Sequence, residues 1–153
     1  MTEPIVTKEQ VLVGVDCRTK DEALRLIAQS AVDQGIGTDA DMVYSAFLER
    51  EKLGPTGMED GLAIPHAKSD SILRPAVCLA KFDKPIVWES LDGNPVTVAV
   101  ALFVPTGEAG TTHVRLLSKV AVLASRGGFS DFISGCNDPK EIADYLRHGI
   151  GEM

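Results

Sequence analysis

A run of nine residues from Val96 to Val104, apolar throughout except for Thr97, limits what this chain can fold into. A turn signal at 92–94 precedes it, and a run of this length and composition is typical of a central strand that is covered on both faces. Covering both faces requires further layers of structure. Short apolar runs alternate with helical patterns along the rest of the chain, which favours a mixed α and β fold.

Periodicity and capping signals predict three more strands and four helices. The expected strands cover Val11 to Val15, Ala76 to Phe82 and Ile86 to Trp88. The expected helices cover about 19–35, 38–53, 111–125 and 138–149, and the third is apolar around most of its circumference, which predicts deep burial. Thr19 and Glu22 form a predicted capping box, Thr38 or Asp39 is expected to start the second helix, and Asp138 the fourth. Between 54 and 75, glycine and proline breaks surround one short apolar piece, which predicts a long irregular segment.

Length, charge and cysteine content narrow the class of protein. The 153 residues suit one compact domain, expected over the whole range 1–153. With 15 Lys and Arg against 22 Asp and Glu, the net charge is −7, which argues against nucleic acid as a partner. Cys17, Cys78 and Cys136 are scattered and odd in number, and no secretory signal opens the chain, so a cytoplasmic location is expected.

Several well-defined catalytic motifs are missing from the sequence. It has no GxxxxGK(S/T) loop, no GxGxxG after a strand, no HExxH or Cys/His cluster and no GxSxG elbow. We therefore expect neither a cofactor nor a metal, while the many acids leave paired-carboxylate chemistry open. The three histidines are the remaining candidates for a reactive group.

His66 follows Pro65 within the irregular segment. Proline fixes its own φ and keeps Ile64 extended, so the imidazole stands on a stiff stretch of backbone, as a nucleophile or general base requires. An exposed loop histidine without a chemical role is the competing interpretation. His148, in the last turn of the last predicted helix, is interpreted as structural.

Two further positions are candidates for binding an anion. His113 follows Thr111 and Thr112 at the start of a predicted helix, where unpaired N–H groups and the helix dipole favour a phosphate. A plain N-cap followed by a surface histidine explains the same pattern. Arg50 ends the second predicted helix, where its guanidinium either clamps a phosphoryl group or complements the helix end. Together these residues favour phosphoryl transfer through phosphohistidine, or simple anion binding.

The chain around these residues resembles the fructose/mannitol-type enzyme IIA domains of the bacterial sugar phosphotransferase system. The matching stretches are, in order, Arg50-Glu51-Lys52-Leu53-Gly54-Pro55-Thr56-Gly57, Gly61-Leu62-Ala63-Ile64-Pro65-His66, Lys84-Pro85-Ile86, Asp92-Gly93-Asn94-Pro95-Val96, Leu102-Phe103-Val104-Pro105 and Thr112-His113-Val114. They cover nearly the whole chain. The family's fold implies an α/β protein with a mixed, mainly parallel sheet of about five strands flanked by helices on both faces.

The resemblance implies a role for each candidate residue. His66 would accept a phosphoryl group from the phosphocarrier protein HPr and pass it to an enzyme IIB, without direct contact with sugar. His113 would hydrogen-bond the phosphoryl oxygens and orient His66. Arg50, Thr56 and Thr112 are expected to help stabilise the phosphoryl group.

The sequence departs from the family pattern in three places, one of which is Ala67, after His66, where glycine is common. Pro55 stands where many relatives have serine, and residues 58–60 bring two carboxylates near an anion site. HPr is expected to dock on an apolar patch drawn from Leu62, Ile64 and Met58. A sugar-transport component is taken as the first role, and a regulatory module of the nitrogen-type branch as the alternative. An anion-binding domain with an inert histidine is the non-enzymatic alternative.

Overall fold

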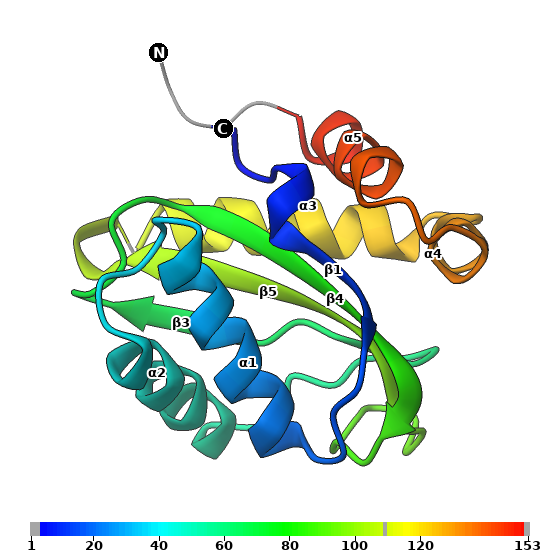
Figure 1. Ribbon diagram of the computed structural model, residues 1–153, viewed down its shortest axis with the longest axis horizontal. Helices are drawn as coiled ribbons and strands as arrows, with labels where there is room; N and C mark the ends of the chain where they lie inside the picture. Colours follow the sequence, from blue (N-terminus) through cyan, green and yellow to red (C-terminus); the bar gives the residue numbers. More distant parts are fainter. Residues whose placement is uncertain (1–3, 109, 152–153) are drawn as a thin grey trace.

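The computed structural model describes residues 4–108 and 110–151, in which a five-stranded sheet is flanked by helices (Figure 1). The strands are β1 (Val11–Val15), β2 (Leu62–Ala63), β3 (His66–Ser69), β4 (Ala76–Ile86) and β5 (Val96–Pro105). The order across the sheet is β1-β4-β5-β2, and β3 also pairs with β5. Among the described pairings, β4 and β5 run antiparallel and the other three are parallel. The predicted mixed, mainly parallel sheet is therefore confirmed.

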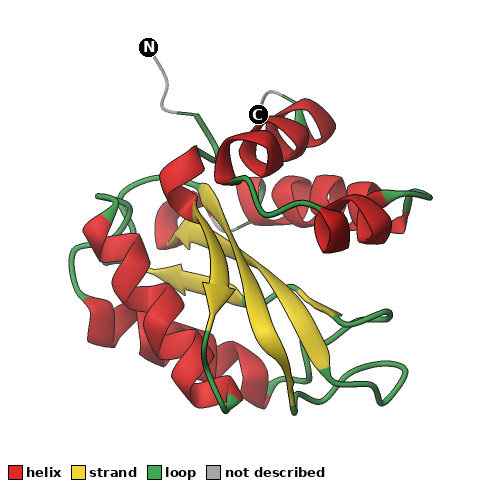
Figure 2. Ribbon diagram, turned by 45° about the vertical axis from the view of Figure 1, so that its right-hand side comes forward, coloured by secondary structure: helices red, strands yellow, loops and turns green. Residues whose placement is uncertain are grey.

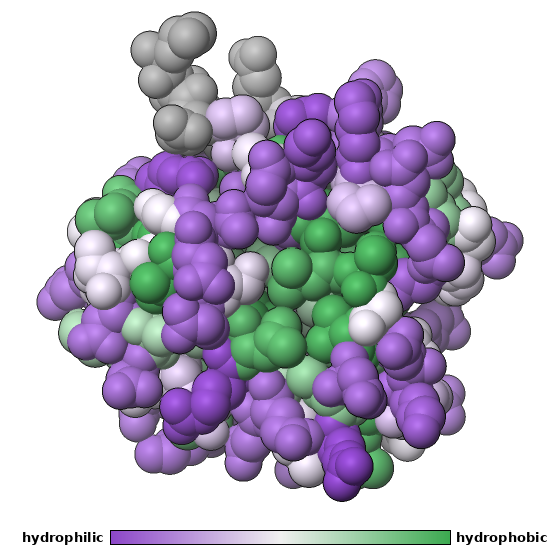
Figure 3. All heavy atoms as spheres, viewed as in Figure 1, coloured by the Kyte–Doolittle hydropathy of each residue, from purple (hydrophilic) through white to green (hydrophobic). Residues whose placement is uncertain are grey.

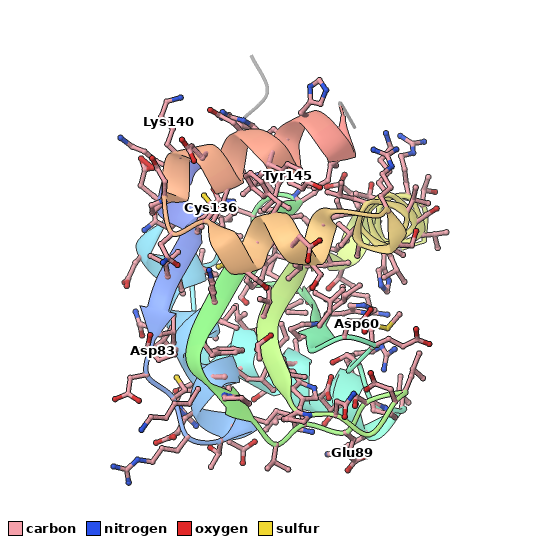
Figure 4. The ribbon with its side chains drawn as sticks, turned by 90° about the vertical axis from the view of Figure 1, so that its right-hand side faces the viewer. Asp60, Asp83, Glu89, Cys136, Lys140 and Tyr145 are labelled. Carbon is pink, nitrogen blue, oxygen red and sulfur yellow. The ribbon has the colours of Figure 1, made fainter. Side chains whose placement is uncertain are left out.

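The helices form two groups, one on each face of the sheet (Figure 2). They are α1 (Lys20–Asp33), α2 (Ala40–Lys52), α3 (Thr112–Ser125), α4 (Phe129–Gly135) and α5 (Pro139–Ile150), with 3-10 turns at Lys8–Gln10 and Thr106–Glu108. α1 and α2 cover one face, and α3, α4 and α5 cover the other. In Figure 4, α5 lies above α4 with Tyr145 between them, and the centroids of the Tyr145 and Phe132 rings are 4.3 Å apart in a stacked pair.

β5 is the central strand that the apolar run predicts. All of its side chains from 98 to 104 are buried, and alternate residues enter different cores. Ala101 and Phe103 contact the core beneath α1 and α2, whereas Leu102 and Val104 contact the core beneath α3, α4 and α5. One apolar strand thus holds both layers of helices in place.

Side-chain caps fix where three of the helices begin. Thr19 accepts a hydrogen bond from the Glu22 backbone N–H at 3.1 Å, which confirms the predicted cap of α1. The Glu22 carboxylate, which a capping box directs to the cap residue itself, instead accepts from the Arg18 N–H at 2.7 Å. Asp39 and Asp138 cap α2 and α5, each accepting from two backbone N–H groups.

Two sequence predictions about strands are wrong. The segment 54–75 is not wholly irregular, because β2 and β3 lie within it and both pair in parallel with β5. The separate strand expected at Ile86 to Trp88 is not found among the described residues. Instead β4 continues to Ile86, which pairs with Val96 beyond a register shift. This irregularity accommodates Pro85, which has no N–H to give to a regular ladder.

α3 and α4 also differ from the predictions. α3 buries Leu116, Val120 and Leu123 along one side, while Val114 and Val122 are 64% and 50% exposed, so the expected burial around most of its circumference is wrong. Spacing at three and four residues decides the buried face more strongly than total apolar content does. α4 has no counterpart among the predicted helices, because seven residues are too few to reveal a helical period.

β1 forms one edge of the sheet and is partly open to solvent. Leu12 and Val13 are half-buried, and a hydrophobic patch lies over this strand and the adjacent β4 (Figure 3). Gly14 has a φ of 65° at a register shift with β4, an irregularity that discourages pairing with another chain. None of the described helices combines the length and the apolar character needed to cross a membrane.

Candidate active site

His66 is the first residue of β3, where the chain joins the sheet. The carbonyl of Pro65 accepts a hydrogen bond from the Leu102 N–H at 2.9 Å, and His66 lies opposite Leu102 in the parallel register. The stiff backbone expected at this position is therefore a strand attached to the central β5. His66 is 7% exposed, so it is shielded but still reaches the surface.

His113 lies against His66, although 47 residues separate the two in the sequence. It is the second residue of α3, and its Nε2 atom is 3.4 Å from Nδ1 of His66. The rings meet edge to face, with centroids 5.0 Å apart and planes at 77°. The structure thus brings together the two histidines that the sequence favours as functional.

The contact with His113 involves only one of the two ring nitrogens of His66. Nδ1 faces His113, and no hydrogen bond within the described part of the chain occupies Nε2. A neutral imidazole carries one proton, and with that proton on Nδ1 and donated to His113 Nε2, the lone pair of His66 Nε2 is free. In this arrangement Nε2 of His66 is a nucleophile.

Both imidazoles are held neutral by their surroundings. Burial, followed by the positive charge of Arg50 and the electrostatic effect of the neighbouring His113, lowers the pKa of His66 to about 3. Burial, followed by the charges of Lys68 and Arg50, also lowers the pKa of His113 below its ordinary value. A neutral ring keeps its lone pair, and the neighbouring cations favour an approaching anion.

Arg50 stands in the last turn of α2, where it contacts the end of that helix. Its Nη1 donates to the Gly54 carbonyl at 2.9 Å, as expected for a cation that complements a helix end. Its charge also acts on His66 and His113 and contributes to the lowered pKa of each. The helix-end contact is therefore observed, and contact with a phosphoryl group stays a prediction.

Thr56 and Thr112 direct their hydroxyl groups at carboxylates. Thr56 is 3% exposed, and its Oγ1 donates to Glu51 Oε2 at 2.6 Å. Thr112, the first residue of α3, donates to Glu108 Oε1 at 3.3 Å. Because both hydroxyl protons already have acceptors, direct contact of either residue with a phosphoryl group stays a prediction.

Lys68 is a residue near the site that sequence reasoning missed. Residues two apart in a strand point to the same face, and Ala67 enters the core beneath α1 and α2. His66 and Lys68 therefore lie on the opposite side, where Lys68 is exposed and its charge helps to lower the pKa of His113. Lys68 would have been found if residues 66–69 had been predicted as a strand. Four residues are too few to show the two-residue alternation of a strand.

A cavity of about 560 Å³ lies between β2 and the corner joining α3 to α4, and neither His66 nor His113 lines it. Leu62, Ile64 and Phe129 line it together with Glu59 and Asp60, so the carboxylates at 59 and 60 belong to this cavity. Figure 4 shows Asp60 below the end of α3. Within the described ranges, no three His, Cys, Asp or Glu side chains converge in a group that could hold a metal ion.

The fold and the paired histidines define a class of protein, an α/β domain with a shielded, neutral imidazole whose Nε2 has no partner among the described residues. The family described as "Phosphoenolpyruvate-dependent sugar phosphotransferase system, EIIA 2" matches residues 4–149, and the chain belongs to this family. The resemblance seen in the sequence motifs is therefore confirmed.

Relatives in this family carry two kinds of name. The chain is 35% identical over 142 residues to the "Nitrogen regulatory protein" of Bradyrhizobium diazoefficiens, covering 93% of this chain and 92% of that one. It is 30% identical over 129 residues to the "PTS system 2-O-alpha-mannosyl-D-glycerate-specific EIIABC component" of Escherichia coli, covering 84% of this chain but 20% of that larger protein.

A solved structure supports the fold. The complex of enzyme IIAMTL and phosphorylated enzyme IIBMTL from Escherichia coli matches with a TM-score of 0.78 at 16% identity, over 94% of this chain and 97% of that one. At this identity the similarity concerns the fold. In that complex, an enzyme IIA of this fold pairs with an enzyme IIB.

Proposed function

We propose that this chain is a histidine phosphocarrier, in which His66 Nε2 accepts a phosphoryl group from phosphorylated HPr and passes it to an enzyme IIB. The observation that carries the proposal is the 3.4 Å contact between His66 Nδ1 and His113 Nε2, which leaves Nε2 of a neutral ring free. Membership in the EIIA family supports a phosphotransfer role, and the Escherichia coli complex supports an enzyme IIB as the acceptor. The cytoplasmic location expected from the sequence belongs to this proposal.

The transfer is a single displacement at phosphorus. The Nε2 lone pair of His66 forms a new N–P bond while the N–P bond of the donor histidine breaks, and that electron pair returns to the donor nitrogen. The Nδ1 proton of His66 stays in place, donated to His113. Arg50 and Lys68 supply positive charge for the phosphoryl oxygens, and the N–H groups at the start of α3 supply hydrogen-bond donors.

We propose a docking surface for HPr that differs from the patch expected from the sequence, in which Met58 is half-buried and the other two residues are buried. Ile64 and Leu62 are only 1% and 9% exposed, so they offer a partner almost no surface. Leu53 and Val114 are 83% and 64% exposed. Leu53 follows α2 and Val114 lies in the first turn of α3, the two helices that also carry Arg50 and His113. We therefore assign the apolar part of the docking surface to these two residues.

The names of the relatives support both candidate roles. The chain is 35% identical to a nitrogen regulatory protein and 30% identical to a sugar-specific EIIABC component. Sugar transport stays the first candidate role. The second is a regulatory role, in which phosphorylation changes binding to other proteins.

Reconstitution tests the carrier function. Incubated with phosphoenolpyruvate, enzyme I and HPr, the wild-type protein is expected to gain one phosphoryl group by mass spectrometry, and His66→Ala none. His148→Ala, which removes an exposed histidine from the last turn of α5, is the matched control and should be labelled like the wild type. His113→Ala is expected to accept the group but to pass it on about tenfold more slowly, because Nδ1 of His66 has lost the partner that orients its ring. Stoichiometric labelling of His66→Ala would refute the assignment.

Onward transfer separates the two roles. The phosphorylated protein is mixed with purified enzyme IIB domains from the same organism, and the rate of transfer is measured. Rapid transfer to the enzyme IIB of one sugar supports the transport role. Transfer to none of them, together with a binding partner that distinguishes the phosphorylated protein from His66→Ala, supports the regulatory role.

A further inference from the structure

A buried carboxylate holds the loop that follows α2. Glu51, in the last turn of that helix, has a side chain that is only 7% exposed. One of its oxygens accepts the Thr56 hydroxyl at 2.6 Å, and the other lies 3.4 Å from Nζ of Lys20 at the start of α1. Because burying a carboxylate is costly without partners, these two contacts account for its place and fix the loop against both helices.

Thr56 connects this anchor to the chain that leads into His66. The backbone carbonyl of Thr56 accepts the Ile64 N–H at 3.0 Å, two residues before His66. The next residue, Gly57, packs so closely on Glu89 that an added Cβ would lie 2.2 Å from its carbonyl oxygen. The loop therefore has little freedom to shift against the strand that carries the nucleophile.

Arg50 belongs to the same short network. It precedes Glu51 in α2, and its Nη1 donates to the Gly54 carbonyl within the loop. The guanidinium is thus attached to the loop through Gly54, and the loop is attached to the His66 strand through Thr56. Arg50 and the strand of His66 are therefore connected through the same loop.

We propose that Glu51 and Thr56 are positioning residues for phosphoryl transfer, because their hydrogen bond sets where the Arg50 guanidinium stands relative to His66. This inference rests on the proposed carrier function. In this role Thr56 acts through Glu51, because its single hydroxyl proton is donated to the carboxylate. Phosphoryl transfer depends on positioning and charge, so a small displacement slows the chemical step without changing how the donor protein binds.

Two substitutions at one position test this role. Thr56→Val keeps the size of the side chain but removes the hydroxyl, whereas Thr56→Ser keeps the hydroxyl and removes a methyl group. With phosphorylated HPr as the donor, Thr56→Val is expected to lower kcat about tenfold, with KM within about twofold of the wild-type value. Thr56→Ser is expected to keep kcat within about threefold. Such rescue by serine is not expected of a side chain that only fills space.

Ser69→Ala is the matched control. Ser69 is buried in the same strand as His66, and its hydroxyl lies 2.9 Å from that of Ser71. This variant also loses a buried hydroxyl contact, but it lies outside the loop, so its kcat should equal that of the wild type.

The outcomes are distinct. A wild-type kcat in Thr56→Val, or a change confined to KM, overturns the positioning role and leaves the carrier function intact. Should Thr56→Val fail to fold, Thr56→Ala adds no bulk and gives the same comparison. A wild-type protein that accepts no phosphoryl group overturns the carrier function itself, and the positioning role with it.

Discussion

At the scale of single residues, the proposed phosphoryl transfer depends on the protonation state of His66. An imidazole in water has a pKa near 6.5, whereas burial, the charge of Arg50 and the neighbouring His113 hold the pKa of His66 at about 3. The folded protein therefore keeps this ring neutral in a range of pH where an unfolded chain would protonate it. Keeping the ring neutral therefore lowers the free energy of unfolding in acid.

The lowered pKa of His66 predicts how the free energy of unfolding changes with pH. Between pH 6.5 and about 3 the unfolded chain binds a proton at His66 that the folded protein does not, so the free energy of unfolding falls as pH falls. From pH 7 to pH 5 the loss from this group is about 2 kcal/mol, and His66→Gln is expected to lack it. Urea unfolding at the two pH values, followed by Trp88 fluorescence, measures the difference. Equal losses in the two proteins would contradict the lowered pKa.

Only part of the site could be predicted from local signals in the sequence. His66 could be proposed from the proline before it and His113 from its place at a helix start, because both signals are local. Their contact could not be inferred from spacing, and only the family resemblance joined them. Lys68 and Glu51 carry no local signal, since one depends on a four-residue strand and the other on a loop that folds back onto its helix.

At the scale of elements, the loop after α2 is held by close backbone packing as well as by Glu51. Figure 4 shows Glu89 at the end of the molecule opposite α5, and Gly57 packs against the carbonyl of that residue. A side chain larger than hydrogen has no room at this position.

Gly57→Ala tests this packing. The new Cβ would lie 2.2 Å from the Glu89 carbonyl oxygen and 2.8 Å from Cα of Ser90, so the loop must move. We expect a loss of about 1–3 kcal/mol in the free energy of unfolding, together with slower phosphoryl acceptance. Gly107→Ala is the control, because a Cβ there meets no atom within 4 Å. Equal urea midpoints for the two variants would show that the contact does not constrain the loop.

Elements with strong local signals were predicted well, and those that depend on tertiary pairing were not. Thr19, Asp39 and Asp138 begin their helices as expected, because a cap acts within one turn. β2 and β3 are two and four residues long and exist only through pairing with β5, so no period in the sequence reveals them. The buried face of α3 likewise follows from what it packs against.

At the scale of the whole molecule, the site forms where the two helical layers approach one another around β3. α2 belongs to the layer on one face and supplies Arg50, while α3 belongs to the layer on the other face and supplies His113. β3 stands between them and supplies His66. Because the three groups come from separate elements, the arrangement exists only in the folded domain.

The position of the phosphoryl group is the most direct test of the central claim. After phosphorylation by HPr, phosphorus-31 and nitrogen-15 NMR of the histidine rings identifies the atom bonded to phosphorus. The structure leads us to expect one phosphohistidine, at Nε2 of His66, with the proton retained on Nδ1. A phosphoryl group on Nδ1 of His66, or on any other residue, would contradict this account.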